Sequence, residues 1–249
     1  MSAPPRSVSV ERVRQPAPPP PGDALSDPPA DTEAPGTYSS AGVFLCFEGG
    51  EGTGKSTQSS ALRTWLQAEG YSVVLTFEPG DTEVGRQIRR IVLDPATGEL
   101  AHRTESLLYA ADKAEHVDTV VLPALALGQV VITDRYVDST LAYQGAGRDL
   151  DVADVESVAR WATRDLRPHL TILLDLAPAA GLGRFAERDR IEGESVQFHE
   201  RVREAFLSMA AANPAHYVVL DAQLPAERLV TAIRDRVRPL LDQARRDRR

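Results

Sequence analysis

The chain has 249 residues, with 28 lysines and arginines against 36 aspartates and glutamates, which gives a formal net charge of −8. This acidic balance argues against a protein that coats nucleic acid, since such proteins carry a basic surface. The single cysteine excludes a disulfide framework or a zinc site built from several cysteines. The longest nearly apolar stretch, 120–127, is far shorter than the roughly 18 residues of a membrane-spanning helix, and the N-terminus lacks the apolar region of a secretory signal. We therefore expect a cytoplasmic protein that binds neither membrane nor nucleic acid.

Residues 1–41 differ from the rest of the chain, because ten of the 18 prolines lie there. The segment has few large apolar residues, so it cannot bury enough surface to offset the entropy lost on ordering. We predict a disordered, partly polyproline-II tail, which is either an inert extension or a docking segment. Residues 42–241 are then one globular domain, and 242–249 are a solvated basic tail.

From residue 42 onward, short apolar stretches alternate with longer amphipathic ones. Each short stretch is nearly continuous in apolar residues, which is typical of a parallel strand covered on both faces. The expected strands are 43–47, 73–77, 130–133, 170–174 and 217–220. The expected helices are 56–68, 84–93, 105–122, 152–165, 196–212 and 226–241. This alternation predicts an α/β fold, a doubly wound five-stranded parallel sheet with helices on both faces, whose ligands bind at the carboxyl ends of the strands.

The first expected strand runs directly into the sequence GGEGTGKS, which matches the phosphate-binding pattern G-x-x-x-x-G-K-[ST]. Glycines let the backbone curl so that several N–H groups point inward, and the following helix adds its N-terminal dipole. We expect Lys55 to reach the β- and γ-phosphates of a nucleoside triphosphate and the Ser56 hydroxyl to bind Mg²⁺. The residues expected to hold this nucleotide are Gly49, Gly50, Glu51, Gly52, Thr53, Gly54, Lys55, Ser56 and Thr57.

A second metal ligand is expected at Asp134, which follows the apolar stretch 130–133 as a Walker-B acid follows its strand. A regulatory GTPase would need an N-K-x-D motif to bind guanine, but the only asparagine, Asn213, is followed by proline. A helicase or transport ATPase would be larger and would carry features for nucleic acid or membrane. The remaining class of P-loop protein is a small-molecule kinase.

Such a kinase needs cations around a second phosphate and a cover that excludes water. Arg135 follows the metal acid, Arg89 lies on the helix after the second strand, and 183–193 is a dense, mixed-charge stretch expected to form a mobile lid. The alternative for the lid arginines is a solvated helix face with paired charges. The expected catalytic residues are Lys55, Asp134, Arg135, Arg184, Arg188 and Arg190.

Four motifs resemble those of bacterial thymidylate kinases and occur in that family's order. Residues 47–58 resemble its phosphate loop, and 134–145, DRYVDSTLAYQG, are similar to its D-R-Y-x-x-S-[ST]-x-A-Y-Q-G signature. Residues 107–113, LLYAADK, resemble its L-L-[FY]-A-A-D-R helix, and 189–192, DRIE, its lid. The resemblance spans about 42–241. It implies a nucleoside monophosphate kinase fold, transfer of the ATP γ-phosphoryl group to dTMP with Mg²⁺, a step in dTTP synthesis, and a homodimer.

The resemblance also implies roles for individual residues of the acceptor site. Arg135 would hold the acceptor phosphate with the help of Arg89, and Tyr109 would stack on the thymine. Tyr143 would crowd the sugar C2′ position and favour deoxyribose. Lys113, Thr140 and Gln144 would contact the base. The full expected set is Glu78, Arg89, Tyr109, Lys113, Arg135, Ser139, Thr140, Tyr143 and Gln144.

Three residues depart from the family's pattern on the acceptor side. The family usually reads T-R-E-P-G-G-T where this chain has TFEPGDT, so Phe77 removes a cation and Asp81 adds an anion. Lys113 replaces a planar guanidinium with a compact ammonium. A kinase for a related or modified pyrimidine deoxynucleotide therefore stays open as an alternative. An ATP-binding regulatory module without turnover is a more remote one.

Overall fold

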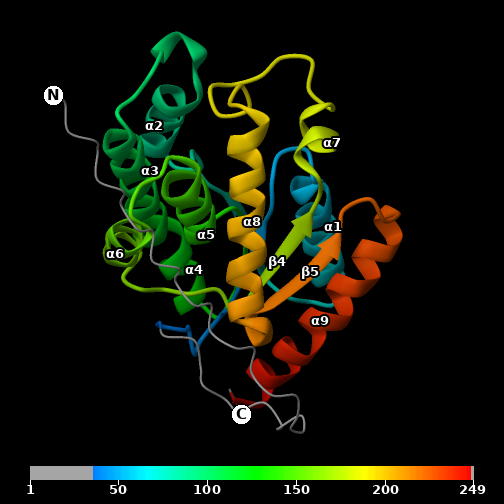
Figure 1. Ribbon diagram of the computed structural model, residues 1–249. Coiled ribbons are helices and arrows are strands. Elements are labelled where there is room, and N and C mark those ends of the chain that lie inside the picture. Colours follow the sequence, from blue (N-terminus) through cyan, green and yellow to red (C-terminus); the bar gives the residue numbers. More distant parts are fainter. Residues whose placement is uncertain (1–35, 248–249) are drawn as a thin grey trace, which may run out of the picture. The chain divides into compact units, whose positions relative to one another are not determined.

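A computed structural model describes residues 36–247 of the chain (Figure 1). All neighbouring strands in its sheet are parallel, in the order β2-β3-β1-β4-β5. The strands are β1 (Val43–Glu48), β2 (Val73–Phe77), β3 (Val130–Asp134), β4 (Leu170–Asp175) and β5 (Tyr217–Asp221). The predicted α/β fold with a five-stranded parallel sheet is confirmed.

The helices follow the strands along the chain, as the alternating pattern predicts. None of the described helices is long and apolar enough to cross a bilayer. The α-helices are α1 (Lys55–Ala68), α2 (Glu83–Leu93), α3 (His102–His116), α4 (Leu122–Ala126), α5 (Val137–Thr140), α6 (Val152–Ala162), α7 (Pro178–Leu182), α8 (Val196–Ala212) and α9 (Ala226–Asp247). Shorter turns are the 3₁₀-helices η1 (Pro95–Thr97) and η4 (Pro214–His216) and the π-helices η2 (Val117–Val121) and η3 (Leu141–Gly147).

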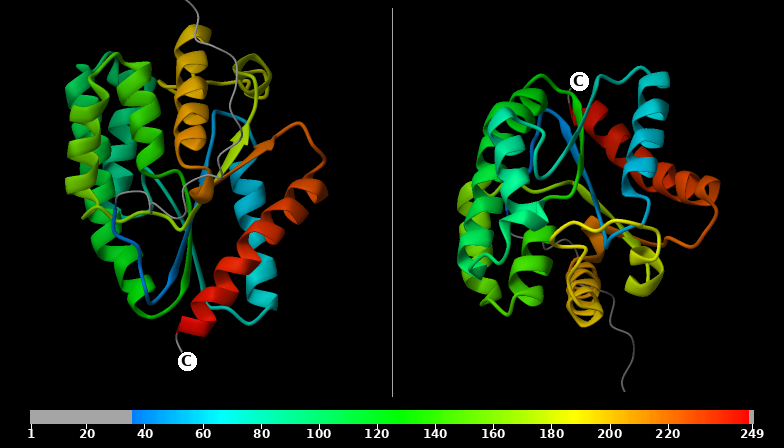
Figure 2. Two further views of the ribbon diagram at one scale, coloured as in Figure 1. Left: turned by 60° about the horizontal axis from the view of Figure 1, so that its bottom comes forward. Right: turned by 90° about the horizontal axis from the view of Figure 1, so that it is seen from above.

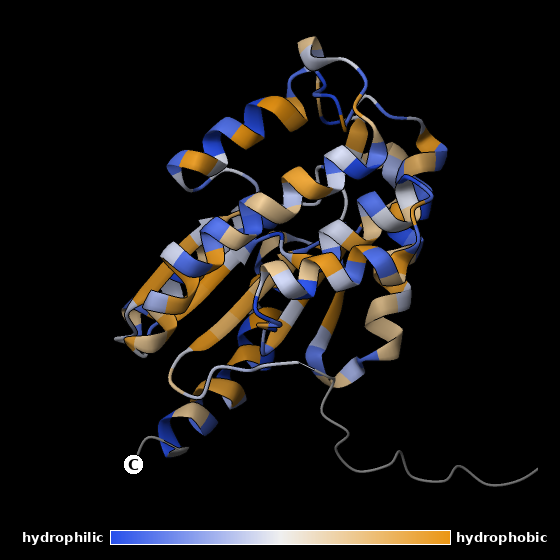
Figure 3. Cartoon of the chain, turned by 90° about the vertical axis from the view of Figure 1, so that its left-hand side faces the viewer, coloured by the Kyte–Doolittle hydropathy of each residue, from blue (hydrophilic) through white to orange (hydrophobic). Residues whose placement is uncertain are grey.

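Helices cover both faces of the sheet. Figure 2 shows α1 and α9 on one face and the green helices, from α2 to α6, on the other. On the first face, α9 buries Leu229, Ile233, Val237 and Leu241 at every fourth position, which is the spacing of one helix face. Figure 3 shows the strands coloured as hydrophobic and the helices alternating between hydrophobic and hydrophilic stretches. The sheet is therefore the apolar centre of the domain, and polar chemistry is left to the loops at its edge.

The strand order opens a crevice between β1 and β3. The two strands are neighbours, with Phe47 opposite Asp134. The chain leaves β1 into α1 on one face, but leaves β3 into α5 on the other, where Val137 joins a separate core. Loops that leave in opposite directions leave room between the carboxyl ends of their strands. The phosphate-binding sequence and the DRY sequence therefore lie on the two sides of one crevice.

Several element boundaries differ from the sequence-based predictions. Four strands run one residue further than predicted and end on an acid, namely Glu48, Asp134, Asp175 and Asp221. The stretch 137–147, which we did not predict to be helical, forms α5 and η3. Its buried residues include the polar Ser139, Thr140 and Gln144, so it lacks the apolar periodicity that signals a helix.

The two predicted tails are corrected where the structure describes them. The backbone of Thr37 forms hydrogen bonds with the segment that leads into β4. Its N–H donates to the Asp165 carbonyl, and its carbonyl accepts from the Arg167 N–H, both at 2.8 Å. Residues 36–41 thus belong to the domain, while 1–35 lie outside the described residues. Helix α9 continues to Asp247, past the predicted end at 241, and the Arg245 guanidinium lies 4.3 Å from the centre of the Tyr71 ring.

Candidate active site

The phosphate-binding sequence forms a tight loop between β1 and α1. Gly49 has a φ of 135°, and a Cβ there would lie 2.3 Å from the Leu174 carbonyl oxygen, so only glycine fits. Gly54, also at positive φ, turns the chain into α1. The loop and its surroundings line a cavity of about 490 Å³, called the donor cavity below. All residues from Glu51 to Thr57 line it.

Lys55 and Ser56 begin α1 at the floor of this loop. The Lys55 ammonium donates to the carbonyls of Gly49, at 3.0 Å, and Gly50, at 2.7 Å. Burial and the nearby Arg135 lower the pKa of Lys55. The Ser56 hydroxyl donates to Asp134 Oδ2 at 2.7 Å. The two predicted metal ligands, which are far apart in the sequence, are therefore in direct contact.

This pair of oxygen ligands fits Mg²⁺. Mg²⁺ is held in proteins by one or two side-chain oxygens, substrate phosphates and several waters, not by an all-protein cage. Within residues 36–247 no group of three or more His, Cys, Asp or Glu side chains could hold a metal by itself. Ser56 and Asp134 beside the phosphate loop are thus the side chains that could hold a nucleotide-bound Mg²⁺.

Arg135 lies between the phosphate loop and a second cavity. It adopts a φ of 72°, and its guanidinium donates to the Gly49 carbonyl and Ser139 Oγ, both at 3.1 Å, and to Glu51 Oε1 at 2.8 Å. Glu51 also accepts from the Tyr143 hydroxyl at 2.7 Å. Burial alone would raise the pKa of Glu51, but the charges of Arg135 and Lys55 lower it to about 2. The Glu51 carboxylate and the Arg135 guanidinium are therefore both charged, and paired with each other, at neutral pH.

The second cavity, called the acceptor cavity below, has a volume of about 140 Å³ and adjoins the first. The two share four charged residues in their linings, Glu51, Glu78, Arg89 and Arg135. All the residues predicted to bind the acceptor line this cavity, namely Glu78, Arg89, Tyr109, Lys113, Arg135, Ser139, Thr140, Tyr143 and Gln144. The structure thus brings together a set drawn from four separate segments of the chain.

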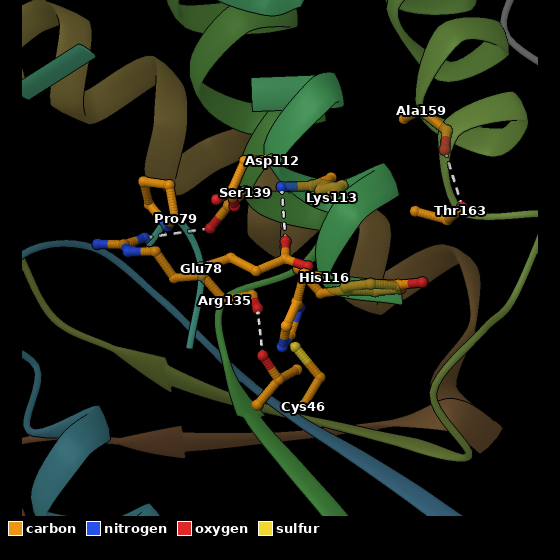
Figure 4. Close-up of polar contacts among 12 residues, drawn as sticks. Cys46, Glu78, Pro79, Asp112, Lys113, His116, Arg135, Ser139, Ala159 and Thr163 are labelled. Atoms are coloured by element: carbon orange, nitrogen blue, oxygen red, sulfur yellow. Dashed lines mark hydrogen bonds and ion pairs between the residues drawn. The ribbon is translucent and has the colours of Figure 1, made fainter. Parts of the chain in front are cut away.

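Glu78 lies at the back of the acceptor cavity, where side chains from α3 converge on it (Figure 4). Lys113 Nζ is 2.8 Å from Glu78 Oε2, and His116 Nδ1 is 2.7 Å from Glu78 Oε1. All three side chains are almost fully buried. Burial alone would raise the pKa of Glu78, but Lys113 and His116 lower it overall. Lys113 is therefore an ion-pair partner of Glu78 as well as a residue of the cavity wall.

The two departures after β2 face different ways. Phe77 lines the donor cavity, and the Arg89 guanidinium lies over its ring at 5.8 Å from the centre. Arg89 also donates to the Pro79 carbonyl at 2.8 Å. Asp81 lines neither cavity and instead accepts from the Thr76 hydroxyl at 2.5 Å. The added anion thus points into the protein, away from the acceptor cavity.

The three predicted lid arginines have different surroundings, and none of them lines either cavity. Arg184 contacts the phosphate loop, since it donates to the Gly52 carbonyl at 2.6 Å. Among the described residues, Arg188 donates to the Leu182 carbonyl alone, at 3.5 Å. Arg190 donates to the Val92 carbonyl at 2.8 Å and pairs with Glu105. The structure places Arg184 against the phosphate loop, whereas Arg190 joins the lid to α3 through its ion pair with Glu105.

Two buried acids at the site were missed by sequence reasoning. Glu48 accepts from the N–H groups of Tyr136 and Ser139 and from the Ser139 hydroxyl, and so joins the phosphate loop to α5. Glu105, on α3, accepts from Gln144 Nε2 at 3.0 Å and from both Arg148 and Arg190. The sequence signal that could have found Glu48 is its place as an acid in the last strand position before the phosphate loop. No local sequence pattern identifies Glu105.

Comparisons with known proteins agree with this geometry. The family model described as thymidylate kinase matches residues 47–233. A thymidylate kinase of Cutibacterium acnes is 52% identical over 201 residues, covering 81% of this chain and 98% of that protein. A thymidylate kinase of Clavibacter michiganensis is 53% identical over 204 residues, covering 80% of this chain and 96% of that protein. The crystal structure of thymidylate kinase from Ehrlichia chaffeensis aligns with a TM-score of 0.60 at 31% identity, covering 72% of this chain and 93% of that one. On this fold, site and similarity, the chain belongs to the thymidylate kinase family.

Proposed function

We propose that this enzyme transfers the γ-phosphoryl group of ATP to dTMP, with Mg²⁺, and forms ADP and dTDP. The observation that carries the proposal is the junction of the two cavities at Glu51, Glu78, Arg89 and Arg135. A nucleoside triphosphate in the loop and a monophosphate in the acceptor cavity would meet there with their phosphates facing. Such a step in dTTP synthesis suits the cytoplasmic location that we propose for the protein.

The reaction needs positioning and charge neutralisation, not a covalent intermediate. An oxygen of the dTMP phosphate attacks the γ-phosphorus in line, and the bond to the β–γ bridging oxygen breaks. Lys55 and the loop N–H groups would hold the leaving β-phosphate side. Ser56 and Asp134 would hold Mg²⁺, which would neutralise phosphate charge there. Arg135 faces both cavities, so it can hold the acceptor phosphate against the charge that develops between the two.

The acceptor cavity has the shape and polarity that a pyrimidine needs. Tyr109 and Tyr143 supply aromatic surface, and Thr140 Oγ1 is buried with no hydrogen-bond partner among the described residues. Gln144 presents its amide nitrogen to Glu105, so its oxygen is left for a donor such as the N3–H of thymine. Lys113 offers a cation to a carbonyl oxygen.

The test is an ADP-release assay with dTMP, dUMP, dCMP and purine monophosphates as acceptors. We expect turnover with dTMP to exceed the others. Absence of turnover with every pyrimidine deoxynucleotide would refute the proposal. A better acceptor than dTMP would favour the related-pyrimidine alternative that Lys113 motivates, and Lys113→Arg should then move the preference toward dTMP.

We also propose a homodimer, as the resemblance implies. The helices opposite α1 and α9 expose large apolar side chains, including Ile91 on α2, Leu107 on α3 and Trp161 on α6, the last 83% exposed. Exposed apolar groups of this size are typical of a surface covered by a partner. Light scattering on the full chain should give twice the monomer mass, and Trp161→Glu should lower it.

A further inference from the structure

A chain of short hydrogen bonds runs behind the acceptor cavity and ends on Glu78. The Thr76 hydroxyl lies 2.5 Å from Asp81 Oδ2 and 2.5 Å from His116 Nε2. The other ring nitrogen of His116, Nδ1, lies 2.7 Å from Glu78 Oε1. Thr76, His116 and Glu78 are all buried, and Asp81 is partly so. Figure 4 shows the last link, with His116 and Lys113 meeting at the Glu78 carboxylate.

The hydrogen-bond geometry along this chain points to one protonation state of His116. A carboxylate only accepts hydrogen bonds, so the single hydroxyl proton of Thr76 goes to Asp81. The Thr76 oxygen can then only accept from His116, which puts a proton on Nε2. Nδ1 faces a second carboxylate, Glu78, and must also carry a proton. A histidine with protons on both nitrogens is a cation.

The surrounding titratable groups are consistent with a cation at this position. The Glu78 carboxylate contacts both His116 and Lys113, and these contacts outweigh burial and lower its pKa. Asp112, next to Lys113 on α3, accepts from the Gly80 N–H at 3.0 Å, and burial with the Glu78 charge raises its pKa to about 6. Burial raises the pKa of Cys46, on β1, so that its thiol adds no charge.

We propose that Asp81, acting through Thr76, holds His116 as a buried imidazolium that positions Glu78 and returns a positive charge to the acceptor side. His116 is a positioning residue, because it reaches the cavity only through Glu78. The functional part of this inference rests on the proposed phosphorylation of dTMP. It explains why one chain carries both departures after β2: Phe77 removes a cation from this side, and Asp81 restores one by way of His116.

The first experiment reads the histidine directly, without turnover. Side-chain ¹⁵N NMR of the full chain at pH 7.5, with the His116 signals assigned by their loss in His116→Asn, should show both ring nitrogens protonated. In Asp81→Gly, which restores the family's usual residue, Thr76 is free to donate to Nε2. The ¹⁵N chemical shift of Nε2 should then move into the range of an unprotonated nitrogen, while Nδ1 keeps its proton and donates it to Glu78.

The matched control is Glu83→Gln, which removes a neighbouring negative charge that is exposed and, within residues 36–247, paired with Arg86 alone. It should leave the His116 signals unchanged. A neutral His116 in the wild type, or an equal shift in Glu83→Gln and Asp81→Gly, would overturn the proposal. This readout needs no substrate, so it can succeed even if dTMP is not the acceptor.

The second experiment is a double-mutant cycle on the KM for dTMP. Asp81→Gly should raise this KM about threefold to tenfold, within the usual range of coupling between neighbouring residues, with little change in the KM for ATP. In a His116→Asn background the same substitution should have no further effect. An equal rise in both backgrounds would show that Asp81 acts independently of His116 and would refute the positioning role. If His116→Asn does not fold, the NMR comparison of wild type, Asp81→Gly and Glu83→Gln decides alone, with the signals assigned by triple-resonance methods.

Discussion

The donor and acceptor cavities lie side by side but are built in different ways. The donor cavity is built around one contiguous glycine-rich turn that leads into Lys55 and Ser56. The acceptor cavity is made of charged and polar side chains from α2, α3, α5, η3 and the lid, and some of them are held by buried partners, as Lys113 is by Glu78. A main-chain site depends on one contiguous sequence, whereas a side-chain site depends on pairs that are distant in the sequence. The two cavities should therefore respond differently to substitution.

The largest effect is expected at the donor cavity, from a single side chain. Lys55→Ala removes the ammonium that the loop carbonyls hold at 3.0 and 2.7 Å. Loss of one preorganised donor to a transferring group typically costs about 10²–10³ in kcat. Single-turnover phosphorylation of dTMP should fall by at least that factor, while the circular dichroism melting curve stays close to wild type. A rate within tenfold of wild type would show that this loop does not hold the reacting phosphates.

The same contrast explains what the sequence could and could not predict. The loop at Gly49 and the positions of the strands were predictable, because apolar strands and a positive-φ turn leave a local signature. Thr140 and Gln144 were placed by family resemblance alone, since the stretch 137–147, which forms α5 and η3, has no apolar period. Glu105 and its partner Arg190 are 85 residues apart, and no local pattern links an acid on one helix to an arginine in a distant loop.

The next effect tests whether the acceptor cavity depends on its buried partners. Glu105 is fully buried between Arg148 and Arg190. Glu105→Gln would leave two guanidiniums without their anion, and removing one partner of a buried ion pair costs about 3–5 kcal/mol. Urea denaturation should show a loss of this size. The matched control is Glu194→Gln, because Glu194 also pairs with Arg148 but is 30% exposed, and there the loss should stay below about 1 kcal/mol. Equal losses would mean that burial of the pair is not what matters.

A smaller effect separates ligand binding from stability within the acceptor cavity. Thr140 and Thr163 are both buried, but Thr163 donates to the Ala159 carbonyl at 2.8 Å (Figure 4), whereas Thr140 Oγ1 has no partner among the described residues. Thr140→Val should raise the KM for dTMP about tenfold, the value of one hydrogen bond, and leave the melting temperature unchanged or higher. Thr163→Val should lower the melting temperature and leave the KM for dTMP unchanged. If the two variants changed the KM for dTMP and the melting temperature in the same way, the Thr140 hydroxyl would not face the ligand.

The smallest effect concerns Glu48 and Glu51, the two acids that flank Gly49 and Gly50. Their pKa values are shifted in opposite directions. Burial, then the Asp138 charge, raise the pKa of Glu48 to about 7, whereas Arg135 and Lys55 overcome burial and lower that of Glu51 to about 2. Between pH 4.5, the ordinary value, and 7, the folded protein keeps the Glu48 proton and the unfolded chain releases it. Stability should therefore fall as pH rises through this window, by at most about 1.4 kcal/mol per pH unit. Glu51 contributes no slope there, because its stabilisation is complete above pH 4.5 and is lost only as pH falls toward 2.

Glu48→Gln isolates this slope, because the amide oxygen can still accept from the N–H groups of Tyr136 and Ser139 but has no proton to lose. Urea denaturation at pH 5, 6 and 7 should give a flatter dependence for the variant than for the wild type, with the two most alike at pH 5. The Glu48 side chain, which joins the phosphate loop to α5, would then be uncharged in the pH range where it stabilises the fold most, even though we propose that the loop binds an anion. Identical slopes would mean that Glu48 is ionised throughout, and that the N–H groups and hydroxyl around it stabilise its charge fully.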